Sequence, residues 1–384
     1  MSEVEYAVVI LVVGARLLLP LTIPYFPVPG AIACLLLDSI DQSIFQKFPG
    51  IPLEGYQSYD KALDVYYLTV EFTSTMRNWT NQTAYKMSWF LYFYRMVGVV
   101  LFELTGVRAV LFIFPNTFEY FFVFYELVRL RWNPRRMGKH TVVWATALIW
   151  VFIKLPQEWW IHIAQLDMTD FIKEEIFGVD KTATWSEAVS ARPEVIVFAV
   201  VAVIGLVALV WWLLKRYAPP ADYRLNWRAD PLPIELQGSD VYSAAKARLR
   251  FVDLGLYQKA AMVSLVAVVF ALFMGGEGTS PIAVVIEVSL FVMINAALSQ
   301  IMARRGRRFR SIAVELAVMA VVNLMIMLSY EAVDRYVSSA EVTFDFRKTL
   351  FFVWLLTLLT VLFDRFYVIH AARREMRLGD VEQA

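Results

Sequence analysis

Long apolar runs alternate with short polar stretches along the whole chain. A helix that crosses a bilayer needs about 20 apolar residues, and eleven runs approach that length. They cover roughly residues 5–22, 28–46, 60–78, 84–105, 108–130, 141–163, 193–214, 259–275, 281–301, 311–330 and 348–369. The pattern predicts an all-α protein, a polytopic integral membrane helical bundle of about eleven transmembrane helices.

Composition supports this class. Of the 384 residues, 59% are hydrophobic and the mean hydropathy is +0.55, more than a water-soluble domain needs. The net charge of +1 gives no reason to expect nucleic acid as a partner. The single cysteine, Cys34, excludes an intrachain disulfide. The first run follows an acidic start and has no small-residue cleavage site, so we expect a retained helix instead of a signal peptide.

The basic residues of the connections predict the orientation, because cytoplasmic loops are enriched in Lys and Arg. Residues 129–140, 214–228, 304–310 and 371–377 are basic, and alternating spans place all four on one side. Residues 157–194 carry eight Asp or Glu against three Lys or Arg and fall on the other side. We therefore expect a multi-pass protein of the cell (inner) membrane, with the N-terminus outside and the C-terminus in the cytoplasm. Two glycosylation sequons within residues 78–83 then lie inside, and we interpret them as chance tripeptides.

The chain divides into five parts by this scheme. Residues 1–163 form an N-terminal membrane half with a polar core, and 164–192 an extracytoplasmic loop with a short helix at 169–178. Span 193–214 follows. Residues 215–258 form a cytoplasmic loop, in which apolar positions at helical spacing predict an interfacial amphipathic helix over 239–259. Residues 259–384 hold the last four spans and a basic tail.

Charged residues concentrate in spans two to six, and on each span they share one face. An α-helix turns about 100° per residue, so positions i, i+4, i+7 and i+11 align. The stripes are Asp38 and Asp41 in span two; Asp60, Asp64, Tyr67 and Glu71 in span three; Ser88, Tyr92, Arg95 and Glu103 in span four; Arg108, Glu119 and Glu126, with Asn116 close by, in span five; and Trp150, Lys154, Glu158 and His162 in span six. Such stripes cannot face lipid, so we expect them to face one another or a water-filled cavity.

Three of these residues lie near the middle of their spans. Glu71, Arg95 and Glu119 are therefore predicted to form a midplane cluster in which the guanidinium is paired with carboxylates. Two carboxylates on one arginine leave an excess negative charge. One of them would then hold a proton or a cation.

The stripe residues that map to the outer helix ends are Asp38, Asp41, Asp60, Asp64, Glu103, Arg108, Lys154, Glu158 and His162, whereas Glu126 maps to the inner side. We expect the four aspartates to lie in one outer polar vestibule, close to Glu158 and His162. The last two are spaced as a pair of ligands for a divalent metal, so a metal cofactor is an open alternative. A hydrogen-bonded network that only holds the helices together explains the same pattern. The vestibule residues are Asp38, Asp41, Asp60 and Asp64.

No known catalytic or nucleotide-binding motif is present in the sequence, neither a Walker sequence, a Gly-rich phosphate loop, HExxH nor GxSxG. We therefore expect a secondary transporter or channel that moves an ion or small solute through spans two to six. Its candidate binding residues are those of the midplane cluster with Asn116, together with the four aspartates. One alternative is a membrane-embedded enzyme acting on a lipid or lipid-linked substrate at the outer leaflet, and another is a non-catalytic membrane scaffold.

Overall fold

The computed structural model describes residues 2–48, 50, 56–166, 168–232, 252–275, 280–304, 312–338 and 346–382. It is all-helical, with 83% of residues in helices and no strand within these ranges. The α-helices are α1 Glu3–Leu18, α2 Pro27–Gln46, α3 Tyr56–Asn78, α4 Gln82–Thr105, α5 Ala109–Ile113, α6 Thr117–Arg129, α7 Lys139–Leu148, α8 Leu155–Glu158, α9 Met168–Phe171, α10 Trp185–Ala191, α11 Pro193–Tyr217, α13 Leu254–Gly275, α14 Pro281–Arg304, α15 Ile312–Ser338 and α16 Phe346–Glu382.

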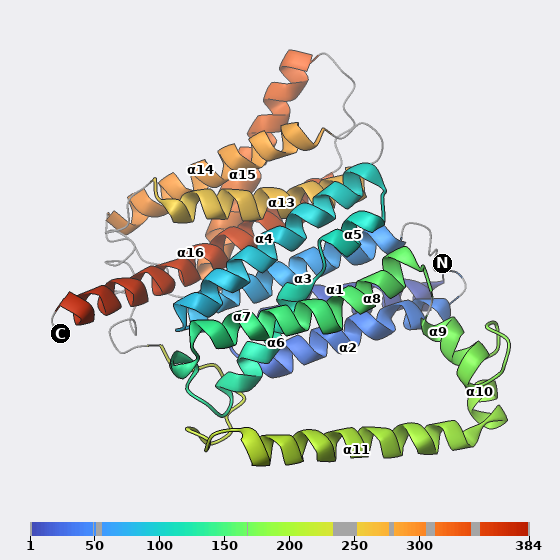
Figure 1. Cartoon of the computed structure of the whole chain (residues 1–384). Helices are drawn as coiled ribbons and strands as arrows, with labels where there is room; N and C mark the ends of the chain where they lie inside the picture. The colour runs from blue at the N-terminus through green and yellow to red at the C-terminus, as the bar shows by residue number, and fades with distance from the viewer. Residues whose placement is uncertain are drawn as a thin grey trace.

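Most of the long helices lie side by side in one bundle (Figure 1). We call the end at which α1 begins the amino end, and the end at which α16 finishes the carboxy end. Helices α1 to α4 alternate in direction between the two. Successive short connections produce this arrangement, since a connection of a few residues leaves little choice but to place neighbouring helices antiparallel.

Helix α3 is the centre of the bundle. It packs against α1, α2, α4, α6, α13 and α16. Its side chain Phe72 is fully buried and stacks on Tyr92 of α4, with ring centroids 4.4 Å apart, and Trp79, the residue after its C-terminal end, stacks on Tyr125 of α6 at 3.9 Å. Because protein surrounds it, α3 can carry a stripe of charges that a lipid-facing helix could not.

All eleven predicted spans are helical, but the expected count of eleven spans is not confirmed. Eight helices in the described ranges are long and apolar enough to cross a membrane. The other three predicted spans are the charged α3, the α7–α8 segment, and α15, whose apolar part is the shorter Ala313–Ser329.

Predicted span five is two helices instead of one. Helix α5 ends at Ile113 and α6 begins at Thr117, with Pro115 between them. Proline has no N–H to donate and disfavours helical geometry in the residue before it, so the helix breaks here. The break leaves backbone carbonyls without helical partners, and α4 supplies donors for two of them. Tyr94 Oη donates to the Ile113 carbonyl at 2.8 Å, and Arg95 Nη1 to the Phe114 carbonyl at 2.9 Å.

Predicted span six is continuous but not a regular α-helix. Pro156 lies in α8, and π-helical turns precede it at Ile149–Lys154 and follow it at Trp159–Ile163. A π turn adds a residue to the helical repeat and accommodates the missing proline donor. Two wider turns therefore flank the proline of predicted span six.

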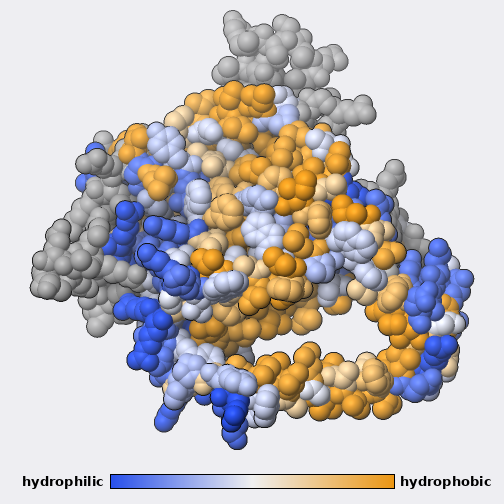
Figure 2. Space-filling model, in the orientation of Figure 1, coloured by the Kyte–Doolittle hydropathy of each residue, from blue (hydrophilic) through white to orange (hydrophobic). Residues whose placement is uncertain are grey.

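Helix α11 is the most isolated part of the described chain. None of its residues is buried, and it is apolar between Glu194 in its first turn and Lys215 in its last. Figure 2 shows an open space between α11 and the bundle. The loop before it contains α9 and α10 at the amino end (Figure 1). There Asp180 accepts hydrogen bonds from the Thr182 amide and hydroxyl, which lower the pKa of its carboxyl.

Two predicted features cannot be compared. The amphipathic helix over 239–259 lies outside the described residues except for its last part, where α13 begins at Leu254. The basic connection 304–310 also lies outside them, apart from Arg304 at the end of α14.

The close approach of α4 to the chain break gives a prediction about Gly98. A Cβ atom at Gly98 would collide with the Cβ of Phe114, whereas one at Gly14 would meet nothing within 4 Å. We expect Gly98→Ala to lower the free energy of unfolding by about 1–3 kcal/mol. Gly14→Ala should be neutral or slightly stabilising, because alanine favours helix. Thermal unfolding of the detergent-solubilised variants measures the difference, and equal melting temperatures would contradict this packing.

Candidate functional site

One arginine gathers the four predicted vestibule aspartates. Arg16 of α1 is 7% exposed. Its Nη1 lies 2.5 Å from Asp41 Oδ2 and 3.0 Å from Asp60 Oδ1, and its Nη2 lies 2.5 Å from Asp38 Oδ1 and 3.0 Å from Asp64 Oδ1. A guanidinium has five N–H donors in a planar fork, so a single side chain can serve several carboxylates at once.

A second cation joins the same group. Lys61 Nζ lies 3.0 Å from Asp60 Oδ2 and 3.2 Å from Asp64 Oδ2. Each of these two aspartates therefore gives one oxygen to the arginine and the other to the lysine. We call these six residues, from α1, α2 and α3, the Arg16 cluster. Four carboxylates against two cations leave it with an excess of negative charge when all are ionised.

The sequence reasoning brought the aspartates together but missed both cations. Arg16 was overlooked because it was counted only as part of an apolar first span. An isolated arginine inside a run such as Val8 to Leu21 is itself a signal, since burying it requires an acidic partner on a neighbouring helix. Lys61 sits beside Asp60 in the sequence and was not considered for pairing.

A cavity of about 390 Å³ opens beside the Arg16 cluster. Asp60 and Lys61 of α3 line it together with Arg108 and with His162 from the segment after α8. Of the four predicted vestibule aspartates, Asp60 therefore lines this cavity together with His162, whereas Asp38, Asp41 and Asp64 are not among its lining residues. The side chain of Asp38 is 39% exposed, whereas Asp41 is fully buried.

A second polar group forms around Glu158 of α8. Its Oε1 accepts a hydrogen bond from the Asn116 backbone N–H at 3.1 Å and lies 3.5 Å from Lys154 Nζ, while its Oε2 lies 3.0 Å from His162 Nε2. Asn116 Nδ2 in turn donates to Glu119 Oε2 at 2.8 Å. Glu158 of α8 thus bonds to Asn116, which lies between α5 and α6. Glu119 lies in the first turn of α6.

The predicted midplane pairing is wrong: Arg95 makes no direct contact of this kind with Glu71 or Glu119. Within the described chain, no ion pair joins Arg95 to a carboxylate, and its guanidinium donates instead to the Phe114 carbonyl. The helix break at Pro115 is the reason. It leaves the Phe114 carbonyl without a helical partner, and this carbonyl accepts the hydrogen bond from Arg95 that Glu119 was expected to accept. The positive charge still acts on Glu158 and Glu119 over a longer distance.

Glu71 is the most isolated carboxylate of the core. It is fully buried, and its Oε1 accepts a hydrogen bond from Tyr67 Oη at 2.7 Å. Its Oε2 has no hydrogen-bond partner, nor does the buried hydroxyl of Ser74 one turn further along α3. The charges of Glu119 and Glu126 are both near enough to act on it. A buried carboxylate in such surroundings has no cation to offset its charge.

Toward the carboxy end, Glu126 of α6 continues the polar series. Trp79 Nε1 donates to its Oε1 at 2.8 Å, and Arg129 Nε to its Oε2 at 2.6 Å. Arg129 Nη1 also lies 3.2 Å from Asp230 Oδ1, whose side chain is 61% exposed. The series of charged groups therefore reaches the surface at this end.

The suggested metal site at Glu158 and His162 stays a prediction. In the structure these two side chains bond to each other, and Lys154 lies against the same carboxylate. A divalent ion there would have to replace the ammonium group. Three other carboxylates, Asp38, Asp60 and Asp64, have oxygens within 4.8 Å of one another, but Arg16 already contacts all three.

The C-terminal half is less uniformly apolar than its sequence suggested. Lys259 of α13 pairs with Asp364 of α16 at 2.7 Å, and Glu315 of α15 with Arg365 of α16 at 2.8 Å. These pairs join helices to one another and contain no unmatched charge. They fit a structural role.

Comparisons with known proteins do not identify the chain. No family model, no curated protein and no solved structure matches it.

The Arg16 cluster gives the clearest stability prediction. We expect Arg16→Gln to lower the free energy of unfolding by about 3–5 kcal/mol, because it leaves Asp41 buried without its counter-ion. Adding Asp41→Asn should restore part of that loss. Arg136→Gln is the matched control, since its pair with Asp222 is at the surface, with 76% of the Arg136 side chain exposed, and should change stability by about 1 kcal/mol or less. The measurement is thermal unfolding of each single and double variant in detergent. Strictly additive losses at Arg16 and Asp41 would show that the two positions are not coupled.

Proposed function

We propose that this protein spans a membrane eleven times and carries protons through the polar core of α1 to α8, as a channel or as the coupling path of a secondary transporter. The observation that carries the proposal is Glu71, a fully buried carboxylate with one oxygen unpartnered. In membrane proteins, an ionisable residue at such a position marks an ion or proton pathway more often than a structural contact.

The charge balance of the core supports a role in binding positive charge. The core holds more carboxylates than Lys or Arg cations. Burying the excess carboxylates in their ionised form would cost a large free energy, because the surroundings have a low dielectric constant. Protons or small cations must therefore neutralise the excess. The described buried and half-buried groups from Arg16 to Glu158 are nine carboxylates, Asp38, Asp41, Asp60, Asp64, Glu71, Glu103, Glu119, Glu126 and Glu158, and seven cations, Arg16, Lys61, Arg77, Arg95, Arg108, Arg129 and Lys154.

These carboxylates follow one another along the bundle. The series starts at Asp60 beside the amino-end cavity and passes Asp64. It continues through Glu119, whose charge acts on Asp64, and Glu71 to Glu126. It ends at exposed Asp230.

The proton suits this series better than a larger solute does. Aromatic side chains such as Phe72, Tyr92 and Phe118 fill the space around the middle of α3 and are fully buried. A proton can pass between hydrogen-bonding groups without an open passage. A solute would need these helices to separate.

Eleven spans are consistent with the helix lengths. Helix α3 has 23 residues, which at 1.5 Å per residue is about 35 Å, enough to cross the hydrocarbon core of about 30 Å. Its charges are bearable because six other helices surround it.

The orientation with the N-terminus outside agrees with the position of the basic segments. Residues 129–138 and 214–228 lie at the carboxy end, while the acidic loop of α9 and α10 lies at the amino end (Figure 1). The two sequons within residues 78–83 do not contradict this orientation. Both asparagines are buried, and their side-chain nitrogens donate to backbone carbonyls, Asn78 to Pro24 and Asn81 to Pro134 and Met137. Asn81 also caps α4.

Removing the charge of Glu71 tests the proposed path. Glu71→Gln keeps the size and can still accept from Tyr67, but it cannot release a proton. In liposomes with an imposed membrane potential and an internal pH-sensitive dye, we expect the variant to lower the proton flux at least about tenfold, because protonation at this position is a required step. Glu194→Gln, an exposed carboxylate at the start of α11, is the matched control and should leave the flux unchanged.

Two results would contradict the proposal. Wild-type liposomes with no flux above that of empty liposomes would remove proton conduction altogether. A flux that Glu71→Gln leaves unchanged would exclude this path through the core.

The orientation has its own test. In a Cys34→Ala background, Asp180→Cys should react with a membrane-impermeant maleimide in intact cells, and Arg136→Cys should react only after the membrane is opened. Both side chains lie at the surface, so accessibility within the fold does not limit labelling. Reaction of Arg136→Cys in intact cells would reverse the assignment.

The amino-end cavity favours one second candidate, an enzyme acting on a lipid head group in the outer leaflet. Asp60 lines the cavity, and three carboxylates are close enough to share a cation. In that case Asp60→Asn should abolish turnover of an added lipid while liposomes show no proton flux. Flux that depends on Glu71, without lipid turnover, would decide for transport.

A further inference from the structure

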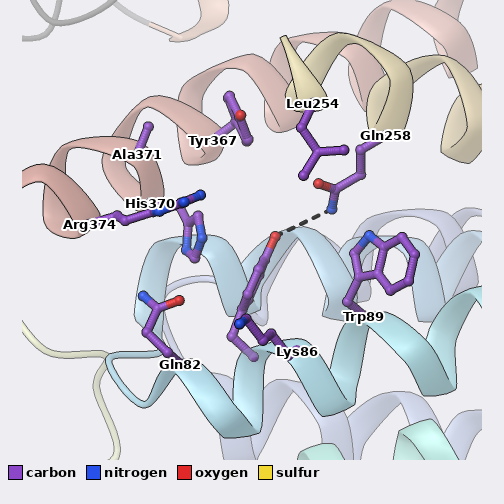
Figure 3. Close-up of a pocket in the computed structure, with 10 residues that line it drawn as sticks. Gln82, Lys86, Trp89, Leu254, Gln258, Tyr367, His370, Ala371 and Arg374 are labelled. Carbon is purple, nitrogen blue, oxygen red and sulfur yellow. Dashed lines mark hydrogen bonds between the residues drawn. The ribbon is translucent and has the colours of Figure 1, made fainter.

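A second and larger cavity, of about 740 Å³, lies at the carboxy end of the bundle. No residue of the Arg16 cluster lines it. Figure 3 shows its ten lining residues between α4 on one side and α13 and α16 on the other. Three different helices, α4, α13 and α16, therefore contribute to its walls. The residues are Gln82, Tyr85, Lys86, Trp89, Leu254, Gln258, Tyr367, His370, Ala371 and Arg374.

The charged residues of this cavity are all basic. Lys86 and Arg374 are exposed and project from α4 and α16, and His370 adds an imidazole ring. None of the ten lining residues is Asp or Glu. The carboxylate of Asp253 accepts a hydrogen bond from one lining residue, from Tyr367 Oη at 3.1 Å. The charge of the lining is therefore complementary to an anion.

The rest of the lining is aromatic and apolar. Tyr85 stacks against His370 with ring centroids 4.0 Å apart, and Gln258 Nε2 donates to Tyr85 Oη at 3.3 Å (Figure 3). Trp89 and Leu254 are exposed at 41% and 71%. Along α4 the order is polar Gln82, basic Lys86, then Trp89, so polarity falls from the helix end toward the middle of the bundle.

From this arrangement we propose that the cavity is a binding site for an acidic phospholipid. Basic pockets between transmembrane helices at the cytoplasmic side bind anionic head groups. Trp and Tyr side chains gather at the level of the lipid head groups. Lys86 and Arg374 contact the phosphate, and Trp89 and Leu254 contact the first part of the acyl chains. The site is independent of the proton path, and its test does not depend on transport.

The test uses the full chain in a mild neutral detergent and three probes. These are a short-chain phosphatidylglycerol, the matching phosphatidylcholine and inorganic phosphate, with binding measured by titration. We expect phosphatidylglycerol to bind and the other two to bind at least tenfold more weakly. The preference for phosphatidylglycerol should fall as salt rises from about 0.05 to about 0.5 M, because Lys86 and Arg374 are exposed and the shorter Debye length at high salt screens their charges.

Two variants locate the site. Lys86→Gln with Arg374→Gln should weaken phosphatidylglycerol binding about thirtyfold, the factor that corresponds to about 2 kcal/mol for two basic residues near a head group. Lys215→Gln with Arg216→Gln is the matched control, because this basic pair ends α11 and does not line the cavity. It should leave binding unchanged.

Three outcomes would overturn the proposal. Equal binding of phosphatidylcholine would show that charge does not select the ligand. Inorganic phosphate that binds as tightly as the lipid would make this a site for a free anion. Unchanged phosphatidylglycerol binding in the Lys86 and Arg374 double variant, with loss in the Lys215 and Arg216 control, would place the lipid on α11.

Discussion

The contact of Arg16 with four carboxylates is the interaction on which the arrangement of the N-terminal half depends. A guanidinium and four aspartates would each be costly among apolar side chains, but together they satisfy one another's charge and hydrogen bonds. Because the five residues come from α1, α2 and α3, the cluster fixes the rotation of all three helices. Helix α3 can then turn its remaining polar stripe toward α6, so that Glu71 lies near Glu119.

Much of this architecture could be predicted from hydropathy and helical spacing. The helices fall where the apolar runs predicted them, and the aspartates at i, i+3 and i, i+4 converge because those offsets share a face. Pairings between helices were harder. The position of Arg16 was missed because a stripe needs at least two polar residues to be recognised, and α1 offers one at that depth. Helical rotation and depth relative to a neighbour are tertiary properties, and spacing along one helix does not contain them.

Pro115 illustrates the second limit. A continuous span five placed Arg108, Glu119 and Glu126 on one face, and from that placement Arg95 was expected to meet Glu119. The proline instead divides the span, and the exposed Phe114 carbonyl becomes the partner of Arg95. The sequence contained the signal, since proline removes a donor and constrains the residue before it. Its effect on a neighbouring helix, however, depends on which side chains reach the break, here Tyr94 and Arg95.

The order of the Arg16 cluster along the chain has a consequence for biosynthesis. A membrane protein enters the bilayer from its N-terminus onward, and α3 carries too many charges to partition into lipid alone. Arg16 precedes Asp60 and Asp64, so the positive partner of these aspartates has left the ribosome before they do. In the proposed eleven-span arrangement, helix α3 can therefore enter the membrane only as part of a unit with α1 and α2 already beside it, whereas α11, which carries charges only near its two ends, can enter without help from any neighbour. A chain that lost α1 would lose α3 from the membrane as well, even though the sequence of α3 itself were unchanged.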